Sequence, residues 1–362
     1  MTFTHLAEPI PITEHNWPEG TIPLVTTRTI TYMHEKYIRD CIDGILMQKT
    51  TFPVQVLIHD DASTDATADI MREYERKYPK LIQCFYQKEN TYRKPNRRDL
   101  MKDYHDAVAG KYIAICEGDD YWTDPLKLQK QAEFLEANPD YGLVHTDAEV
   151  YNTVSHKRRK HIYLRHWSNY KGGNEFEKIL MGHYPIVTCT SMYRSEMSRY
   201  FPQGRRFVAG DMIIWLEIAH RSKIKFFSDS TSVRQILEES ATRSKSWDKM
   251  LAFRMGSYEL MKHFIEKYGC SDECRRQTAH TYYKQFLFMA FMAGNKAEAK
   301  KAYMRIKGIS MLSIQDKLCF LGSKASFLKC ICYPLIIVAN KLTNAKQRML
   351  VRKKMVSNLH KL

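Results

Sequence analysis

Short apolar segments alternate with amphipathic ones through the first third of the sequence. Residues 22–27, 54–59, 81–86 and 112–116 are largely apolar or β-branched, and stretches with helical periodicity, such as 37–46, lie between them. This alternation is typical of a parallel sheet covered by helices. In such sheets ligands bind beyond the carboxyl ends of the strands. The sequence therefore predicts an α/β fold with its functional site at that edge.

Two of these predicted strands end in carboxylates. Asp60 and Asp61 follow residues 54–59, and Glu117, Asp119 and Asp120 follow residues 112–116. Carboxylates at the end of a buried strand repel one another and lose hydration, which a divalent cation with oxygen ligands usually offsets. The alternative is an acidic turn whose charges face water. The frame of buried strand, glycine and tryptophan around 117–120 favours metal and phosphate chemistry.

Glycine is nearly absent where phosphate-binding loops need it. Between Gly20 and Gly110 there is only Gly44, and it lies inside a predicted helix. A dinucleotide fingerprint or a P-loop is therefore excluded from this part of the chain. Phosphate would have to be held through metal and carboxylates, with basic side chains assisting. Four basic residues before the helix that feeds the acidic strand either contact a diphosphate or form a solvated charge run: Arg93, Lys94, Arg97 and Arg98.

Composition limits the class of protein and its partners. With 362 residues, 44% hydrophobic, the chain suits one large α/β domain plus an appendage. Nine cysteines without zinc-like spacing predict a reducing, cytoplasmic compartment, where Cys41 and Cys116 act as small hydrophobes. We expect neither a signal peptide nor a spanning segment. The net charge is +16, but ten Lys and Arg and no acid lie from Lys317 onward, which makes nucleic-acid binding by the whole protein less favoured.

Three segments together resemble a known family. LVTTRTITYMHEKYIRDCIDGILMQ, VLIHDDASTDAT and GKYIAICEGDDYWTDPLKLQKQAEFLE are similar, in order and spacing, to family 2 glycosyltransferases, over about residues 22–235. The resemblance implies a GT-A fold, a Rossmann-like α/β sheet, here with a C-terminal α-helical appendage. It also implies an inverting transferase that moves a sugar from a nucleotide diphosphate donor. We expect a UDP-sugar donor and a role in bacterial polysaccharide or lipopolysaccharide biosynthesis.

The resemblance also assigns the two acidic groups. It implies that Asp60 and Asp61 meet the nucleoside base and ribose, and that Glu117, Asp119 and Asp120 hold Mn²⁺ or Mg²⁺ on the donor diphosphate. Glu117 stands where an Asp is more frequent, so which carboxylate ligates the metal stays open. The expected nucleotide-sugar-binding residues are Thr27, Asp60, Asp61, Arg97, Arg98, Asp119 and Arg234.

Asp211 is the candidate general base. On sequence alone it is a helix cap, since it follows Gly210 and precedes the apolar run 212–219. By resemblance it takes the place of the family's catalytic acid, usually written Glu-Asp. Inverting transfer needs a base that accepts the proton of the acceptor hydroxyl. Residues 233–244, with Arg234 and Ser240, resemble the loop that closes over donor and acceptor.

The remaining segments complete the expected organisation. Residues 151–173 combine basic and aromatic residues and are expected to form a loop over the active site, and 185–193 a strand on the acceptor side. The tail suits either a helix in the interface of an anionic membrane or a solvated basic segment. The predicted regions are an N-terminal arm (1–21), a catalytic domain (22–240), a helical region (241–322) and a basic amphipathic tail (323–362).

The expected partners are a nucleotide-sugar donor and a saccharide or lipid-linked saccharide acceptor, at the inner face of the cell membrane. One alternative is a sugar-phosphate nucleotidyltransferase, which would carry a glycine-rich, Arg-containing loop where this chain reads TTRTITYM. A more distant one is a non-catalytic nucleic-acid-binding protein. Acidic groups at two strand ends oppose a phosphate-backbone footprint on that face.

Overall fold

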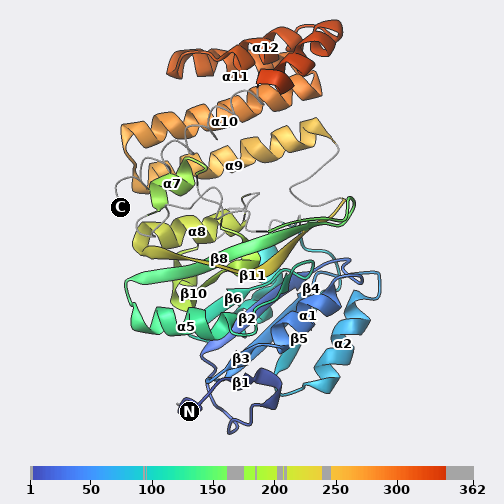
Figure 1. Cartoon of the computed structure of the whole chain (residues 1–362), viewed down its shortest axis with the longest axis vertical. Coiled ribbons are helices and arrows are strands. Elements are labelled where there is room, and N and C mark those ends of the chain that lie inside the picture. Colours follow the sequence, from blue (N-terminus) through green and yellow to red (C-terminus); the bar gives the residue numbers. More distant parts are fainter. Residues whose placement is uncertain are drawn as a thin grey trace, which may run out of the picture. The chain divides into compact units, whose positions relative to one another are not determined.

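The computed structural model describes residues 3–92, 94, 96–160, 175–183, 186–201, 207, 210–238 and 246–339. The chain divides into two compact units (Figure 1), one of residues 1–179 and 183–238 and the other of residues 180–182 and 239–362. The boundary that we predicted at residue 240 lies in 239–245, outside the described residues.

The first unit is built on one large mixed sheet. Its strands run in the order β5-β4-β2-β6-β10-β8-β11-β7, and β9 pairs with β8. The pairs β2–β4, β2–β6, β4–β5 and β8–β11 are parallel, whereas β10 is antiparallel to β6 and β8. The strands are β2 (Val25–Thr31), β4 (Val54–Asp60), β5 (Ile82–Tyr86), β6 (Tyr112–Ile115), β7 (Tyr121–Trp122), β8 (Tyr141–Asn152), β9 (Lys157–Arg159), β10 (Met192–Arg194) and β11 (Lys223–Ile236).

Helices cover both faces of this sheet. The apolar sides of α1, α2 and α5 pack with Val25, Val56 and Ala114 in the main core. On the other face Tyr104 of α4 packs against Leu57. The first unit also contains a small sheet of β1 and β3. Its further elements are β1 (Ile10–Pro11), α1 (Ile38–Leu46), β3 (Lys49–Thr50), α2 (Thr67–Lys77), α3 (Arg97–Leu100), α4 (Lys102–Asp106), α5 (Lys127–Ala137), α7 (Phe176–Leu180) and α8 (Gly210–Arg221).

Strand register brings the predicted acidic groups to one edge. Thr31, at the end of β2, pairs with Asp60 at the end of β4, and Arg28 pairs with Ile115 at the end of β6. Beyond β6, Tyr121 of β7 pairs with Val233 of β11. The turn 117–120 therefore lies between the carboxyl ends of β2 and β11, as the parallel α/β prediction required.

Two predicted segments differ from the structure. The expected strand over 185–193 is a 3₁₀ turn, Thr188–Thr190, followed by the three-residue strand β10. Thr190 donates from both its amide and its hydroxyl to the carbonyl of Val187, which closes the turn and interrupts the strand. Of the expected loop over 151–173, residues 151–160 form the β8–β9 hairpin, and 161–174 lie outside the described residues.

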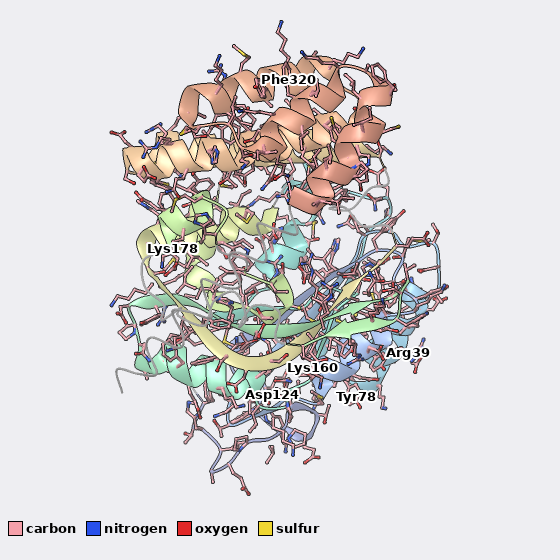
Figure 2. All side chains as sticks on the ribbon, turned by 45° about the horizontal axis from the view of Figure 1, so that its top comes forward. Arg39, Tyr78, Asp124, Lys160, Lys178 and Phe320 are labelled. Atoms are coloured by element: carbon pink, nitrogen blue, oxygen red, sulfur yellow. The ribbon has the colours of Figure 1, made fainter. Side chains whose placement is uncertain are left out.

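The second unit is helical. Side chains of Ser246, Ser271, Asn295 and Ser313 accept backbone hydrogen bonds at the starts of its four long helices, which satisfies otherwise orphaned amides. Phe320, labelled in Figure 2, stacks on Tyr303 with ring centroids 4.1 Å apart. The helices are α9 (Trp247–Tyr268), α10 (Asp272–Ala293), α11 (Lys296–Ile309) and α12 (Ile314–Ser323), and residues 326–339 are helical as well.

No helix within the described ranges is both long and apolar enough to cross a bilayer. Most of the predicted basic tail, residues 340–362, lies outside the described residues.

Candidate functional site

The acidic turn 117–120 is held against the end of β2 by backbone hydrogen bonds. The amide of Cys116 donates to Arg28 O (3.1 Å), and the amide of Gly118 donates to Ile30 O (3.1 Å). The amide of Asp120 donates back to Glu117 O (2.9 Å) and closes the turn. Three carboxylates are thereby placed on four consecutive residues, 117–120, whose backbone is fixed by the neighbouring strand.

Burial makes these carboxylates costly to ionise. Asp120 is only 6% exposed, and its Oδ1 accepts the amide of Gln235 in β11 (2.8 Å). Burial, with the charge of Asp119 adding to it, raises the pKa of Asp120 to about 7. Burial and then the charges of Asp120 and Asp119 raise the pKa of Glu117 well above its ordinary value. Among the described residues, Glu117 Oε2 is buried without a hydrogen-bond partner. The turn is therefore short of positive charge.

Two thiols support the turn from inside. Cys41 Sγ, on α1, donates to Glu117 O (3.4 Å), and Cys116 Sγ donates to Asp120 O (3.5 Å). Both cysteines are fully buried. Sequence reasoning treated them as small hydrophobes and missed this positioning role, because it depends on where α1 packs beneath the turn.

The second acidic group lies at the end of β4. Both carboxylates are almost fully buried: Asp60 accepts the amide and hydroxyl of Ser63 (3.0 and 2.5 Å), and Asp61 accepts those of Thr91 (2.8 and 2.6 Å). Burial raises the pKa of Asp60, and the bonds from Ser63 oppose that shift. Arg97 Nε in turn donates to Thr91 Oγ1 (3.4 Å), so this predicted basic residue stands next to Asp61.

His34 lies between the two acidic groups and was not predicted. Its Nδ1 is buried with no hydrogen-bond partner in the described part of the chain. Burial lowers the pKa of His34, while the charges of Asp119, Asp65 and Asp60 oppose that shift. The only sequence signal is its place in the loop after the first strand, where parallel sheets bind ligands.

Asp211 faces the acidic turn from another element. It lies in the first turn of α8, keeps exposed surface, and accepts the amide of Met212 at Oδ1 (2.9 Å). The surrounding protein still desolvates the carboxyl enough to raise its pKa, which Arg234 opposes. The charge of Asp211 is among those that raise the pKa of Glu117. The charge of Arg234 lowers the pKa of Asp120. Glu117, Asp120, Asp211 and Arg234 thus interact electrostatically.

Some predicted residues are placed elsewhere. Thr27 is fully buried within β2 between β4 and β6, and its assignment to the donor site stays a prediction. Arg98 is exposed on the turn that carries Arg97. Arg93 and Ser240 lie outside the described residues, and residues 233–236 of the predicted closing loop belong to β11.

The carboxylates of residues 117–120 fit a metal ion whose coordination shell is completed by a bound ligand. In the described ranges no group of three or more His, Cys, Asp or Glu side chains is arranged to bind a metal ion by itself. Mg²⁺ and related ions commonly take one or two carboxylates and complete their shell with substrate phosphates and water. The unpartnered Oε2 of Glu117 and the raised pKa of Asp120 agree with that type of site.

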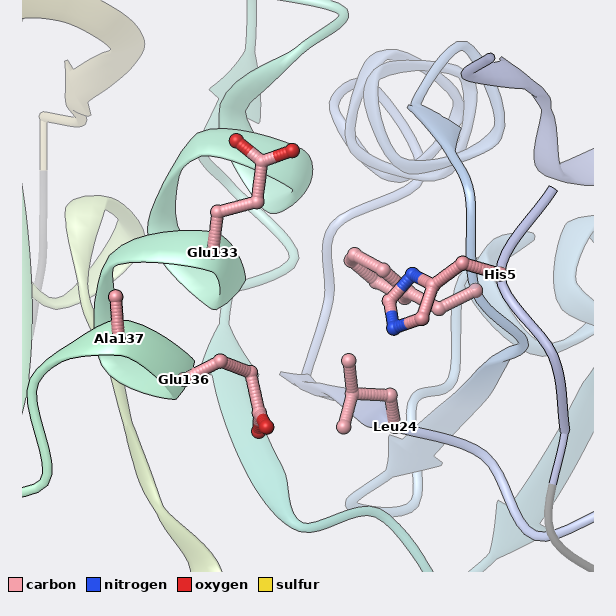
Figure 3. A pocket seen from close by; sticks show the side chains of 6 residues that line it. His5, Leu24, Glu133, Glu136 and Ala137 are labelled. Carbon is pink, nitrogen blue, oxygen red and sulfur yellow. The ribbon is translucent and has the colours of Figure 1, made fainter. Parts of the chain in front are cut away.

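A hollow elsewhere in the first unit is unrelated to this chemistry. It has a volume of about 380 Å³ and is lined by residues that include Leu24, Phe52 and Glu136 (Figure 3). Leu24 directly precedes β2, so the hollow lies at the amino ends of the parallel strands. The acidic groups lie at the opposite, carboxyl ends.

The family model for glycosyl transferase family 2 matches residues 29–201, a range that contains both acidic groups. Residues 29–201, a little under half of the chain, are therefore similar to family 2 glycosyltransferases. Rv1520, an uncharacterized protein of Mycobacterium tuberculosis, is 47% identical over 112 residues, or 31% of each chain. TuaG, a putative teichuronic acid biosynthesis glycosyltransferase of Bacillus subtilis, is 34% identical over 120 residues, 33% of this chain and 43% of TuaG. The matches thus span less than half the length of these relatives.

A solved structure supports the fold of the chain. S. aureus TarS 1–349 in complex with UDP-GlcNAc superposes with a TM-score of 0.52 at 15% identity, over 83% of this chain and 79% of that one. This likeness confirms the predicted GT-A fold, an α/β sheet accompanied by C-terminal helices.

Gly118 provides a direct test of how the turn is positioned. A Cβ at this residue would lie 2.6 Å from Thr31 Cβ and 3.0 Å from His34 Nδ1. We expect Gly118→Ala to push the turn away from β2, to lower the free energy of unfolding by about 1–3 kcal/mol and to weaken nucleotide binding. Denaturant melts and nucleotide titrations measure both effects.

Gly308→Ala is the matched control, because nothing lies within 4 Å of a Cβ there. In the helix α11 this change should stabilise by about 0.5–1 kcal/mol. A Gly118→Ala protein with unchanged stability and nucleotide affinity would contradict the close contact between the turn and β2.

Proposed function

We propose that the protein is an inverting, metal-dependent glycosyltransferase that takes its sugar from a nucleotide diphosphate donor. The observation that carries this proposal is the convergence of two buried acidic groups at one sheet edge, with Asp211 and Arg234 in electrostatic range of the second group. The family match covers both acidic groups. A uridine nucleotide is the favoured donor, since the fold neighbour TarS was solved with UDP-GlcNAc.

The donor would lie along the carboxyl ends of β4, β2 and β6. Asp60 and Asp61 are assigned to the ribose and base, with Arg97 beside them through Thr91. Two of the three carboxylates of residues 117–120 would hold Mn²⁺ or Mg²⁺ against the diphosphate. When bound, the metal supplies charge stabilisation for the leaving nucleotide. Arg234 adds a positive charge close enough to lower the pKa of Asp120.

Asp211 is assigned the role of general base. Its carboxyl has exposed surface and accepts the amide of Met212 at Oδ1, and Oδ2 is assigned to the acceptor hydroxyl. A raised pKa strengthens it as a base at neutral pH, because the carboxylate then holds a proton more tightly. The oxygen of the acceptor attacks the anomeric carbon as its proton passes to Asp211, and the bond to the diphosphate oxygen breaks. No covalent intermediate is needed.

The acceptor is assigned to the saccharides or lipid-linked saccharides of bacterial polysaccharide synthesis. The relative TuaG is a putative teichuronic acid biosynthesis glycosyltransferase, which supports a polymer of the cell surface.

A panel of nucleotides tests the proposal and identifies the nucleoside base of the donor. UDP, GDP, CMP and dTDP are each added with Mn²⁺, with Mg²⁺ or with EDTA, and thermal unfolding is followed. We expect UDP with Mn²⁺ or Mg²⁺ to raise Tm by about 5 °C at saturating concentration, and no shift with EDTA, because ligands stabilise the state that binds them. If no nucleotide raises Tm with either metal, the donor-site assignment is wrong.

A further inference from the structure

The helix formed by residues 326–339 exposes apolar side chains along one side. Phe327, Ile331, Leu335 and Val338 recur at helical spacing and are 66%, 57%, 50% and 53% exposed. Side chains of this kind normally face a core. Here they form a continuous outward stripe, which we call the apolar stripe, on a helix that belongs to the second unit.

The opposite side of this helix is packed, so the stripe cannot turn inward. Cys332 and Ile336, four residues apart, are almost fully buried. A Cβ at Gly322 of α12 would lie 3.0 Å from Cys332 Cβ, which shows how closely the helix approaches α12. The ring of Tyr333 lies 6.5 Å from that of Phe291 in α10. These contacts fix which side of the helix faces the solvent.

The sequence that contains the apolar stripe carries charge of one sign. From Lys317 to the end of the chain the sequence has ten Lys and Arg and no Asp or Glu. Lys324 lies just before the helix, and Lys329 lies within it and donates to Met292 O. An acidic protein surface would match the charge but not the apolar stripe. An anionic lipid surface matches both, because apolar side chains enter the acyl boundary while basic ones meet the headgroups.

We propose that the apolar stripe of residues 326–339 docks this protein on an anionic lipid bilayer. The helix lies in the interface of the bilayer and does not cross it, consistent with the absence of a spanning helix among the described residues. This places a membrane contact in the helical unit, and it stands independently of the proposed transfer chemistry.

Vesicle co-sedimentation of the full chain tests the proposal. We expect the protein to bind phosphatidylglycerol–phosphatidylcholine vesicles, to bind phosphatidylcholine vesicles much more weakly, and to release from the anionic vesicles as salt is raised. The double variant Ile331→Glu, Leu335→Glu should lower partitioning by at least about tenfold, since each change places a charge in the apolar boundary. Both side chains are at least half exposed, so folding should be retained, as circular dichroism would verify.

Ile22→Glu is the matched control, because Ile22 is 57% exposed in the other unit, and its binding should equal that of the wild type. A second readout uses Cys330, the exposed one of the nine cysteines, all of which are described. An environment-sensitive fluorophore there should shift to the blue on anionic vesicles. The proposal is overturned if the wild type does not bind anionic vesicles, or if the double variant binds as well as the wild type. It is equally overturned if light scattering shows that the stripe holds a dimer that the double variant dissociates without any vesicle binding.

Discussion

Asp211→Asn is expected to slow sugar transfer by about a thousandfold, within the range that general bases contribute. The amide cannot accept the proton of the acceptor hydroxyl. It keeps an oxygen for the amide of Met212, and the residue is exposed, so Tm should change by less than about 1 °C. Donor affinity should be unchanged, since the assigned donor contacts lie on other elements. Nucleotide release from the donor sugar with an acceptor extract measures the rate, and thermal shift measures donor binding.

Asp69→Asn is the control for this variant. Asp69 also lies in the first turn of a helix, α2, and its side chain is 82% exposed, so its change to Asn should leave transfer unaffected. If Asp211→Asn transfers sugar at the rate of the wild type, Asp211 is not the base. If it unfolds, its role is structural.

Asp120→Asn is expected to remove the stabilisation that UDP and metal give together. The variant keeps an oxygen for the amide of Gln235 but loses the charge that would face the metal. The Tm increase of about 5 °C predicted for UDP with Mn²⁺ should therefore fall to near zero. Cys116→Ala, which removes a thiol contact to the carbonyl of Asp120 and leaves the carboxylates in place, should retain most of that increase.

Asp120→Asn should also make the ligand-free protein more stable at neutral pH. The folded protein holds a proton on Asp120 up to about pH 7, whereas the unfolded chain releases it near the ordinary value of 3.8. Ionisation of this carboxyl therefore costs folding stability as pH rises between about 4 and 7. We expect the free energy of unfolding of Asp120→Asn to exceed that of the wild type by about 2 kcal/mol at pH 8 and to equal it at pH 4. This difference is smaller than the full pKa shift would give at about 1.4 kcal/mol per pKa unit, because neighbouring carboxylates share the charge.

Denaturant melts at pH 4, 6 and 8 measure that difference directly. His34, whose pKa is lowered, contributes with the opposite sign in both proteins, so the comparison between the two removes its contribution. A variant that still shows the full metal-dependent increase with UDP would exclude Asp120 from the donor site.

Strand ends were the most predictable part of the site. The apolar runs 54–59 and 112–116 correspond to β4 and β6 within one residue, because strands buried on both faces need continuous apolar sequence. Once both strands were placed in one parallel sheet, the convergence of Asp60 and the turn 117–120 followed from topology alone.

The half of the sheet that contains β10, β8, β11 and β7 was not predictable in this way. β11 carries many polar residues and is interrupted by register shifts between Phe227 and Ser232, so it shows neither a continuous apolar run nor a clean alternation. Its last residues were consequently assigned to a loop. The hydrogen bond from the amide of Gln235 to Asp120 depends on that strand, so it could not be predicted either.

His34 and Cys41 illustrate a second limit. Each meets the turn 117–120 from a segment about eighty residues earlier in the chain, and neither belongs to a motif that a pattern could identify. Their role follows from how the loop after β2 and the helix α1 pack against the turn. Long-range contacts of this kind need coordinates.

The central claim is that the carboxylates of residues 117–120 hold a metal against the donor diphosphate. Crystals grown with UDP and Mn²⁺, measured at a wavelength where manganese scatters anomalously, locate that metal directly. We expect an anomalous peak within about 2.3 Å of an oxygen of Glu117, Asp119 or Asp120 and of a diphosphate oxygen, the distance usual for such ions and oxygen ligands. UDP bound with its diphosphate away from this turn, or manganese held by other side chains, would contradict the account.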